Sequence, residues 1–270
     1  MGRSTKVSGA SVPKQATRRQ QNIASYLYGV VPGDTKLSRD DRGLGDPAGE
    51  VQLVRHGEIA VLMSDVNVDQ PLGQPGDFLA YERLLDSVAA KAPVLPFRFG
   101  AVMANPEAVV EELLKPFHDE FLGALQELAG QAEYIVKGRY VESAVMGEIL
   151  AENPEAAGLR EAIRGRSEDV TRNERIRLGE IIAAGIEAKR DMDTRMLLDA
   201  LASHFSTAVV REPTHEQDAV HVAMLAKVDE QRALEKALGR LGERWEGRVN
   251  LRLLGPLAPY DFVVAQEQGV

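Results

Sequence analysis

The sequence predicts an α+β protein with two domains, because segments patterned as strands and segments patterned as helices alternate in two successive series. The first series covers residues 22–130 and the second covers residues 131–254. A chain of 270 residues is long enough for two domains of ordinary size. Residues 1–21 are expected to form a disordered basic arm, and residues 255–270 a tail that packs back on the body.

The first series begins with a β-branched and aromatic strand at residues 22–31, which a Pro-Gly-Asp turn ends. A polar loop and a hairpin that turns at residues 56–58 follow. A Pro/Gly-rich loop then leads to a helix whose apolar stripe is expected to face the core. That stripe consists of Phe78, Leu84, Leu85 and Val88.

Residues 92–103 have the composition of a strand that contains Pro96. Because proline donates no backbone hydrogen bond, this strand is expected at a sheet edge or with a bulge at that residue. A helix follows with Asn105 as its N-cap and Pro106 at its first position. A further helix ends at Gly130 and completes the first domain.

The second series has the order β-α-β-β-α-β, which is the order of the ferredoxin-like unit, an antiparallel sheet with helices on one face. Its first connection is unusually long and holds several helices, with interruptions expected near Asn153-Pro154 and Gly165. The last helix is expected to be capped by Asp229 and closed by Gly242, and Gly255-Pro256 to break the last strand. The expected elements are a strand at 131–142, helices between 142 and 204, strands at 206–212 and 218–228, a helix at 229–242 and a strand at 246–256. In the strand at 218–228, alternate residues are expected to share one face, namely Val220, Val222, Met224, Ala226 and Val228.

Residues 167–205 read as a helix of about 55 Å, which would extend beyond a small sheet. The favoured interpretation is a crossover that folds back and buries its own apolar stripe, and the alternative is a projecting arm that binds a partner. If the helix projects, charge reversal at Arg175 and Lys189 is expected to disturb partner binding. The stripe consists of Leu178, Ile182, Ile186, Met196, Leu201 and Phe205, and the opposite side of Glu174, Arg175, Glu187, Lys189 and Arg190.

Charge and composition exclude several classes of protein. The chain carries a net charge of −9, but residues 1–22 hold five basic residues and no acid, so the remainder carries −14. An acidic body repels a phosphate backbone, which argues against nucleic-acid binding by the folded part. The basic arm is interpreted as a solvated tail or a vector-derived leader, with binding to an acidic partner as the alternative. The absence of cysteine excludes disulfides and thiolate chemistry. With no apolar run of about 18 residues and no secretory signal, a cytoplasmic protein is expected.

Sequence motifs identify no catalytic, cofactor-binding or metal-binding residues. The glycine-rich segment at 43–49 resembles a phosphate cradle, but it follows a charged loop, and Pro47 stands where a helix should begin. His215 and His221 lack the spacing that places two ligands on one helix face. His118 lies at a helix start, where Asp119 and Glu120 favour the helix dipole. His56 and His204 read as surface or cap residues.

Two clusters of aromatic residues and proline stand out. In the segment Pro-Phe-Arg-Phe-Gly at 96–100, Arg98 could pair with a carboxylate or bind an anion. The favoured interpretation is structural, with both phenylalanines filling a core face. In the closing segment Gly-Pro-Leu-Ala-Pro-Tyr-Asp-Phe, Tyr260 and Phe262 can bury apolar area, so the tail is expected to lie across a groove, between the two domains.

Four segments in this order resemble the gas vesicle protein family GvpF/GvpL. They are the opening strand YLYGVV, the segment VLPFRFGAVM, the helix FLGALQELAG that leads into AEYIVKGRY, and the ending LLGPLAPYDFV. Together they span residues 23–264. The sequence departs from the family pattern at Tyr81-Glu82, where a His-Glu pair is common, and at Ala258, where a bulky residue or proline is common.

The resemblance implies a non-enzymatic accessory or minor structural protein of gas vesicle formation. Such a protein would act in the cytoplasm at the gas vesicle, contacting the hydrophobic shell protein GvpA and other accessory proteins during nucleation and assembly. The resemblance carries over no catalytic or cofactor residues and does not separate GvpF from GvpL. The alternatives are a small-molecule-binding regulatory protein with a ferredoxin-like domain, which rests on fold analogy, and an enzyme with a dispersed active site.

Overall fold

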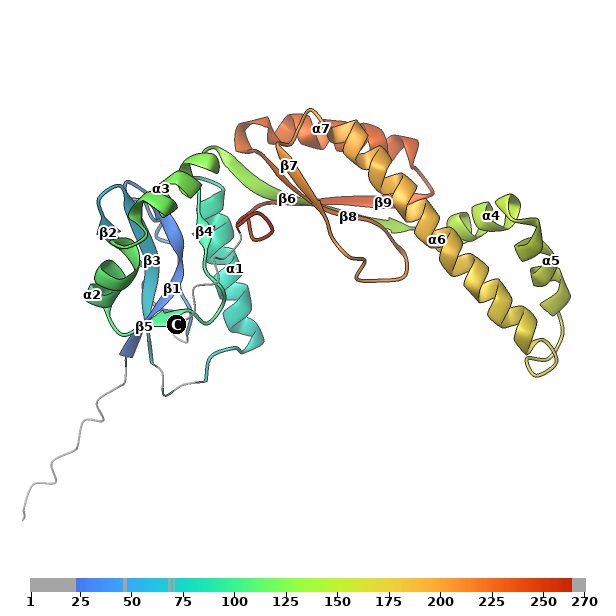
Figure 1. The fold of residues 1–270 in the computed structure, drawn as a ribbon, viewed down its shortest axis with the longest axis horizontal. Helices are drawn as coiled ribbons and strands as arrows, with labels where there is room; N and C mark the ends of the chain where they lie inside the picture. Colours follow the sequence, from blue (N-terminus) through green and yellow to red (C-terminus); the bar gives the residue numbers. More distant parts are fainter. Residues whose placement is uncertain (1–22, 46–47, 68, 70, 264–270) are drawn as a thin grey trace, which may run out of the picture.

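The computed structural model describes residues 23–45, 48–67, 69 and 71–263. The predicted arm at 1–21 and the last seven residues of the predicted tail lie outside the described residues. The described chain is a mixed α+β protein with two antiparallel sheets and seven α-helices (Figure 1). The elements are β1 (Ile23–Pro32), β2 (Gln52–His56), β3 (Ile59–Asn67), α1 (Pro75–Ala89), β4 (Leu95–Pro96), β5 (Val102–Met103), α2 (Pro106–Ala108), the π-helix η1 (Val109–Leu114), α3 (His118–Glu127), β6 (Gln131–Tyr140), α4 (Glu142–Glu152), α5 (Pro154–Ile163), α6 (Arg172–Leu201), β7 (Thr207–Val210), β8 (Asp218–Lys227), the 3-10 helix η2 (Val228–Glu230), α7 (Gln231–Arg244) and β9 (Val249–Leu257).

The first sheet has the strand order β2-β3-β1-β4, with β5 also paired to β1. Helix α1 packs on one face, and η1 with α3 packs on the other. Because both faces are covered, β1 and β3 are buried along almost their whole length. The predicted stripe of α1 is confirmed at Leu84, Leu85 and Val88, but Phe78 is exposed.

The segment at 92–103 is not one strand. It forms the two-residue strands β4 and β5, separated by a turn in which Gly100 has φ 96°. Pro96 lies in β4 at the end of the strand order, so the predicted edge position is confirmed. The predicted cap is also confirmed, because the side chain of Asn105 accepts a hydrogen bond from the backbone N–H of Ala108.

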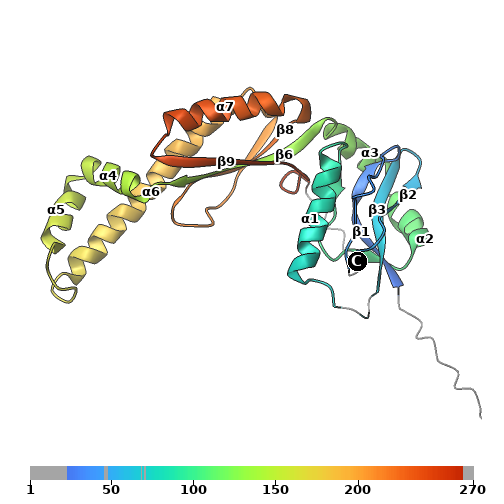
Figure 2. The same cartoon turned by 180° about the vertical axis from the view of Figure 1, so that it is seen from behind.

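The second sheet has the strand order β7-β8-β6-β9, and every neighbouring pair is antiparallel. Helices α6 and α7 lie on one face, as Figures 1 and 2 show from opposite sides. The core beneath them includes the predicted alternating set of β8. These core residues are Val220, Val222, Met224 and Ala226, with Val228 packed against them.

Three predicted element boundaries in this half were wrong. Asp229 lies inside the 3-10 helix rather than at a cap, and α7 continues past Gly242 to Arg244. Strand β9 continues through Gly255-Pro256 to Leu257, because Leu257 still pairs with Glu133 of β6.

Helices α4, α5 and the N-terminal part of α6 form an arm that extends beyond the second sheet (Figure 1). The break at Asn153-Pro154 is confirmed, and the Asn153 side chain caps α5 by accepting a hydrogen bond from the N–H of Ala156. The two interpretations of this segment are both partly correct. The arm projects, yet α4 and α5 fold back on α6 and bury the start of its stripe around Leu178.

The opposite face of the second sheet carries the tail and the loop between β7 and β8, which lie below the sheet in Figure 1. The side chain of Glu133 on this face contacts Asp261 of the tail, and His221 contacts Glu212 of the loop. The two ends of this face are therefore covered by irregular chain.

Candidate functional site

The structure brings the two aromatic clusters of the sequence together in one groove beside α1. The groove has a volume of 640 Å³. The 96–100 segment, α1 and the tail each contribute to its walls. Its lining consists of Phe78, Tyr81, Glu82, Pro96, Phe97, Arg98, Phe99, Tyr260, Asp261 and Val263.

Tyrosine hydroxyls of the first sheet and of α1 hold the 96–100 segment in place. The hydroxyl of Tyr81 donates a hydrogen bond to the carbonyl oxygen of Phe97. The N–H of Gly100 donates to the hydroxyl of Tyr26 over 2.8 Å. These bonds satisfy backbone groups that have no partner strand at this turn.

The two phenylalanines of this segment do not fill one core face. Phe99 packs against the core under α1, whereas Phe97 packs against the core under α3. Phe78 stacks on Phe99 with ring centroids 4.1 Å apart and remains 45% exposed. Arg98 is exposed and makes no ion pair within the described ranges, so its predicted pairing with a carboxylate is not seen.

A charged cluster fixes the tail at the end of this groove. The Arg211 guanidinium after β7 donates to Asp261 over 2.7 Å and lies 3.3 Å from the carboxylate of Glu133. The N–H of Asp261 donates to the second oxygen of Glu133 over 3.0 Å. Glu133 on β6 has a completely buried side chain, so these contacts compensate a carboxylate removed from water.

A second contact ties the tail to the first sheet. The buried N–H of Ala258 donates to the carboxylate of Asp86 on α1 over 2.9 Å. Burial raises the pKa of Asp86 to about 6, although the bond from Ala258 opposes the rise. Burial also raises the pKa of Glu133 to about 7, while Arg211 opposes the rise. The tail is therefore held by two carboxyl groups that gain protons more readily than solvated ones do.

The groove also contains two phenols with low acidity. Burial raises the pKa of Tyr81 and of Tyr260, so both hydroxyls stay protonated in neutral solution. Their rings lie 6.5 Å apart. The groove presents aromatic faces and hydroxyl groups, which suits the binding of an apolar or aromatic side chain.

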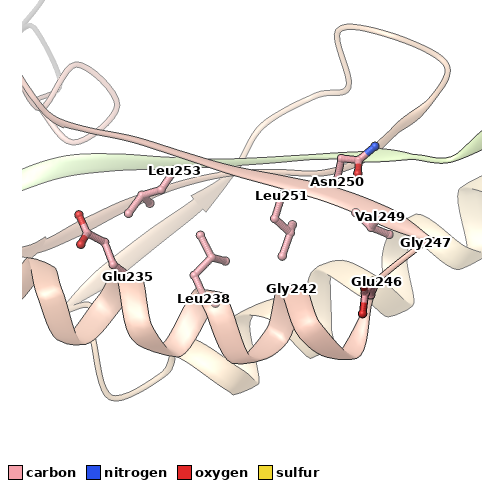
Figure 3. A pocket seen from close by; sticks show the side chains of 10 residues that line it. Glu235, Leu238, Gly242, Glu246, Gly247, Val249, Asn250, Leu251 and Leu253 are labelled. Carbon is pink, nitrogen blue, oxygen red and sulfur yellow. The ribbon is translucent and has the colours of Figure 1, made fainter.

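A second groove lies between α7 and β9 and has a volume of 440 Å³ (Figure 3). Leu238 of α7 faces Leu251 and Leu253 of β9 across it, and Glu235 and Glu246 stand at its two ends. The glycines of α7 leave this groove open, because they carry no side chain to fill it.

The glycine-rich segment at 43–49 does not form a phosphate cradle in its described part. The N–H groups of Gly43, Leu44 and Gly49 all donate hydrogen bonds within the protein, so they are not free to bind an anion. Pro47 lies outside the described residues.

Two of the histidines contact each other at the surface of the first sheet. His56 and His118 pack edge to face, with ring centroids 5.8 Å apart, and His118 bonds Asp119 over 2.9 Å. His221 is buried in β8, and its Nδ1 donates to the carbonyl of Glu212. Within the ranges described, no three His, Asp or Glu side chains form a group that could hold a metal ion.

One buried network of charged residues was not predicted from the sequence. Asp193 on α6 accepts hydrogen bonds from Tyr140 over 2.6 Å and from Arg248 over 2.9 Å. Lys189, one turn earlier, is buried and lies 2.9 Å from Glu148 of α4. This network joins the arm to the sheet. Helical periodicity placed Lys189 on the solvent side, and only the position of α4 shows otherwise.

In the part of the chain that the structure describes, no helix combines the length and apolar character needed to cross a membrane.

Comparison with known proteins identifies the class. The profile of the family described as "Gas vesicle synthesis protein GvpL/GvpF" matches residues 24–264. The chain therefore belongs to the GvpL/GvpF family. Gas vesicle protein F of Streptomyces sp. (strain CB03234) is 30% identical over 243 residues, which are 89% of this chain and 100% of that protein. Gas vesicle protein F of Dolichospermum flosaquae is 23% identical over 89% of this chain and 98% of its own length.

Solved structures share the fold. The crystal structure of GvpF from Anabaena sp. PCC7120 superposes with a TM-score of 0.73, at 21% identity, over 89% of this chain and 98% of that chain. The structure of GvpF from Microcystis aeruginosa gives a TM-score of 0.71 at the same identity and coverage.

Proposed function

We propose that this protein is a non-enzymatic accessory or minor structural component of gas vesicle formation, which contacts the shell protein GvpA and other accessory proteins in the cytoplasm at the gas vesicle. The observation that carries the proposal is the family match, which spans almost all of the described chain. A shell subunit with a water-repelling face needs a partner that covers that face until it assembles.

The aromatic groove is the surface that suits this role best. Phe78 and Tyr260 are 45% and 37% exposed at its rim, so the groove offers apolar area to a partner. Aromatic residues are enriched where proteins bind other proteins. The perturbed carboxyls nearby are engaged by the tail, which supports a structural role for them.

We also propose the division into two domains, 22–130 and 131–254, with the second domain a ferredoxin-like unit and residues 255–270 a tail. The strand order β7-β8-β6-β9 supports this division, as do the separate cores of the two sheets. Expression of residues 131–257, which contain all of β9, tests it, because a ferredoxin-like domain should unfold cooperatively in denaturant.

Affinity capture of GvpA from cells that co-express both proteins tests the proposed function. Full-length chain is expected to capture GvpA, and the double variant Phe78→Ser/Tyr260→Ser to capture less. Leu79→Ser is the matched control, because Leu79 is 51% exposed on the same helix and does not line the groove. A chain lacking residues 1–22 shows whether the arm contributes. Capture equal to that of an unrelated acidic protein would contradict the proposal.

A further inference from the structure

A row of basic side chains crosses the second sheet on the face opposite its helices. Lys137 of β6 pairs with Arg252 of β9 on one side and with His221 of β8 on the other. Arg139 follows Lys137 on the same face, because side chains alternate along a strand. Lys137, Arg139 and Arg252 are all exposed.

This arrangement is unfavourable for the isolated protein. Like charges directly opposite each other on antiparallel strands repel, and Lys137 and Arg252 are such a pair. Neither makes an ion pair within the described residues, and Arg139 approaches its carboxylate partner, Asp218, only to 3.8 Å. A chain with a net charge of −9 has many acidic residues that could have been placed beside these cations.

Two basic residues next to this row, Arg211 and His221, add no unpaired positive charge to it. Arg211 is engaged by Glu133 and Asp261. Burial lowers the pKa of His221, and Lys137 and Arg211 lower it further, so its imidazole is neutral at pH 7. Within the described residues of this row, the positive charge without a carboxylate partner is therefore carried by Lys137 and Arg252, and Arg139 adds a cation that is held only loosely by Asp218, at 3.8 Å.

We propose that Lys137, Arg139 and Arg252 form a docking surface for an acidic segment of a partner protein. The spacing favours a peptide over a small anion. Lys137 and Arg139 are two positions apart on one strand, about 7 Å, which is also the separation of alternate side chains in an extended peptide. Carboxylates at alternate positions of such a peptide would meet successive cations, which gives charge complementarity along the sheet. This inference goes beyond the proposed function and does not depend on GvpA being the partner.

The proposal can be tested on the full-length chain with a peptide of ten glutamates. A carbodiimide joins carboxylates to lysine amines without a spacer, and mass spectrometry then locates the joined lysines. Lys137 is expected to be joined about fivefold more than Lys236, an exposed lysine of α7 on the other face of the sheet. Lysines of the basic arm are mapped separately and do not affect this ratio.

Two charge-neutralising variants sharpen the test. Arg252→Gln is expected to lower the yield at Lys137 about threefold or more, whereas Arg240→Gln on α7 changes the net charge equally and should leave it unchanged. Equal yields at Lys137 and Lys236, or no effect of Arg252→Gln in a variant that melts like the parent, would overturn the proposal. So would loss of the Lys137 product in inorganic phosphate but not in chloride of equal ionic strength, because the site would then bind phosphate.

Discussion

The carboxylate of Asp86 in α1 accepts a 2.9 Å hydrogen bond from the backbone N–H of Ala258, just after the last strand of the second sheet. The two residues are 172 positions apart in the sequence. Because Ala258 is completely buried, its N–H has no access to water as an alternative partner. This bond links the helix of the first sheet to the chain that leaves the second.

Replacing Asp86 with alanine is expected to lower the free energy of unfolding by about 1–3 kcal/mol, because it leaves the buried N–H of Ala258 without an acceptor. Asp86→Asn keeps an acceptor oxygen and is the matched control. Denaturant unfolding at pH 7 measures both variants. Equal stability of the two would show that the bond does not hold the tail.

Arg211→Met is expected to destabilise the protein by about 3–5 kcal/mol at pH 8, because it leaves the carboxylate of Glu133 buried without its cation. The loss should be smaller at pH 5.5. The pKa of Glu133 is raised to about 7, so its contribution to stability is present at low pH, where the folded protein holds the proton, and is lost as the pH rises through about 7.

The double variant Arg211→Met/Glu133→Gln provides the control for this pH dependence. It removes the titrating group, so the difference in unfolding free energy between pH 8 and pH 5.5 that Arg211→Met produces should largely disappear. A pH dependence that persists in the double variant would assign the effect to another group.

Gly29→Ala is expected to destabilise the first sheet by about 1–3 kcal/mol, because the added methyl would lie 2.7 Å from the carbonyl oxygen of Leu95 in β4. Backbone cannot move aside as a side-chain end can. Gly123→Ala in α3 is the control, since a methyl there meets nothing within 4 Å and alanine favours a helix. Equal melting temperatures for the two variants would contradict the close approach of Gly29 to the backbone of β4.

Charge reversal at Lys189 and at Arg175 is expected to change the melting temperature by different amounts, although the sequence placed both residues on the same side of the helix. Lys189→Glu is expected to lower the melting temperature strongly, because Lys189 is buried between Glu148 and Glu152. Arg175→Glu should leave the melting temperature nearly unchanged, because Arg175 is exposed and, among the described residues, its side chain hydrogen-bonds to Thr171 and Arg166 without forming an ion pair. Partner binding through the arm is therefore to be tested with Arg175→Glu alone.

Much of the fold was predictable from local pattern. Alternation identified β8, and the Asn-Pro pairs located the starts of α2 and α5, because caps and strand periodicity are local properties. The end of β9 was not predictable, because pairing with β6 carries the strand through Gly255-Pro256. Tertiary contact overrides turn chemistry at that position.

The candidate site was predictable only in part. The aromatic residues of 96–100 and the tail stood out in the sequence, and the structure joins them in one groove. Arg211 and Glu133 could not be connected, because they lie 78 positions apart and meet only through strand order. The basic row on the second sheet likewise depends on the register of β6 with β9, which no local pattern gives.

The most direct test of the central claim is gas vesicle formation by cells that carry the gas vesicle genes with and without this chain. The account predicts that cells lacking the chain form few or no vesicles by electron microscopy and that supplying the full-length chain restores them. The Phe78→Ser/Tyr260→Ser variant, checked to be folded, should restore fewer than Leu79→Ser. Normal vesicles in cells that lack the chain would contradict a role in their formation.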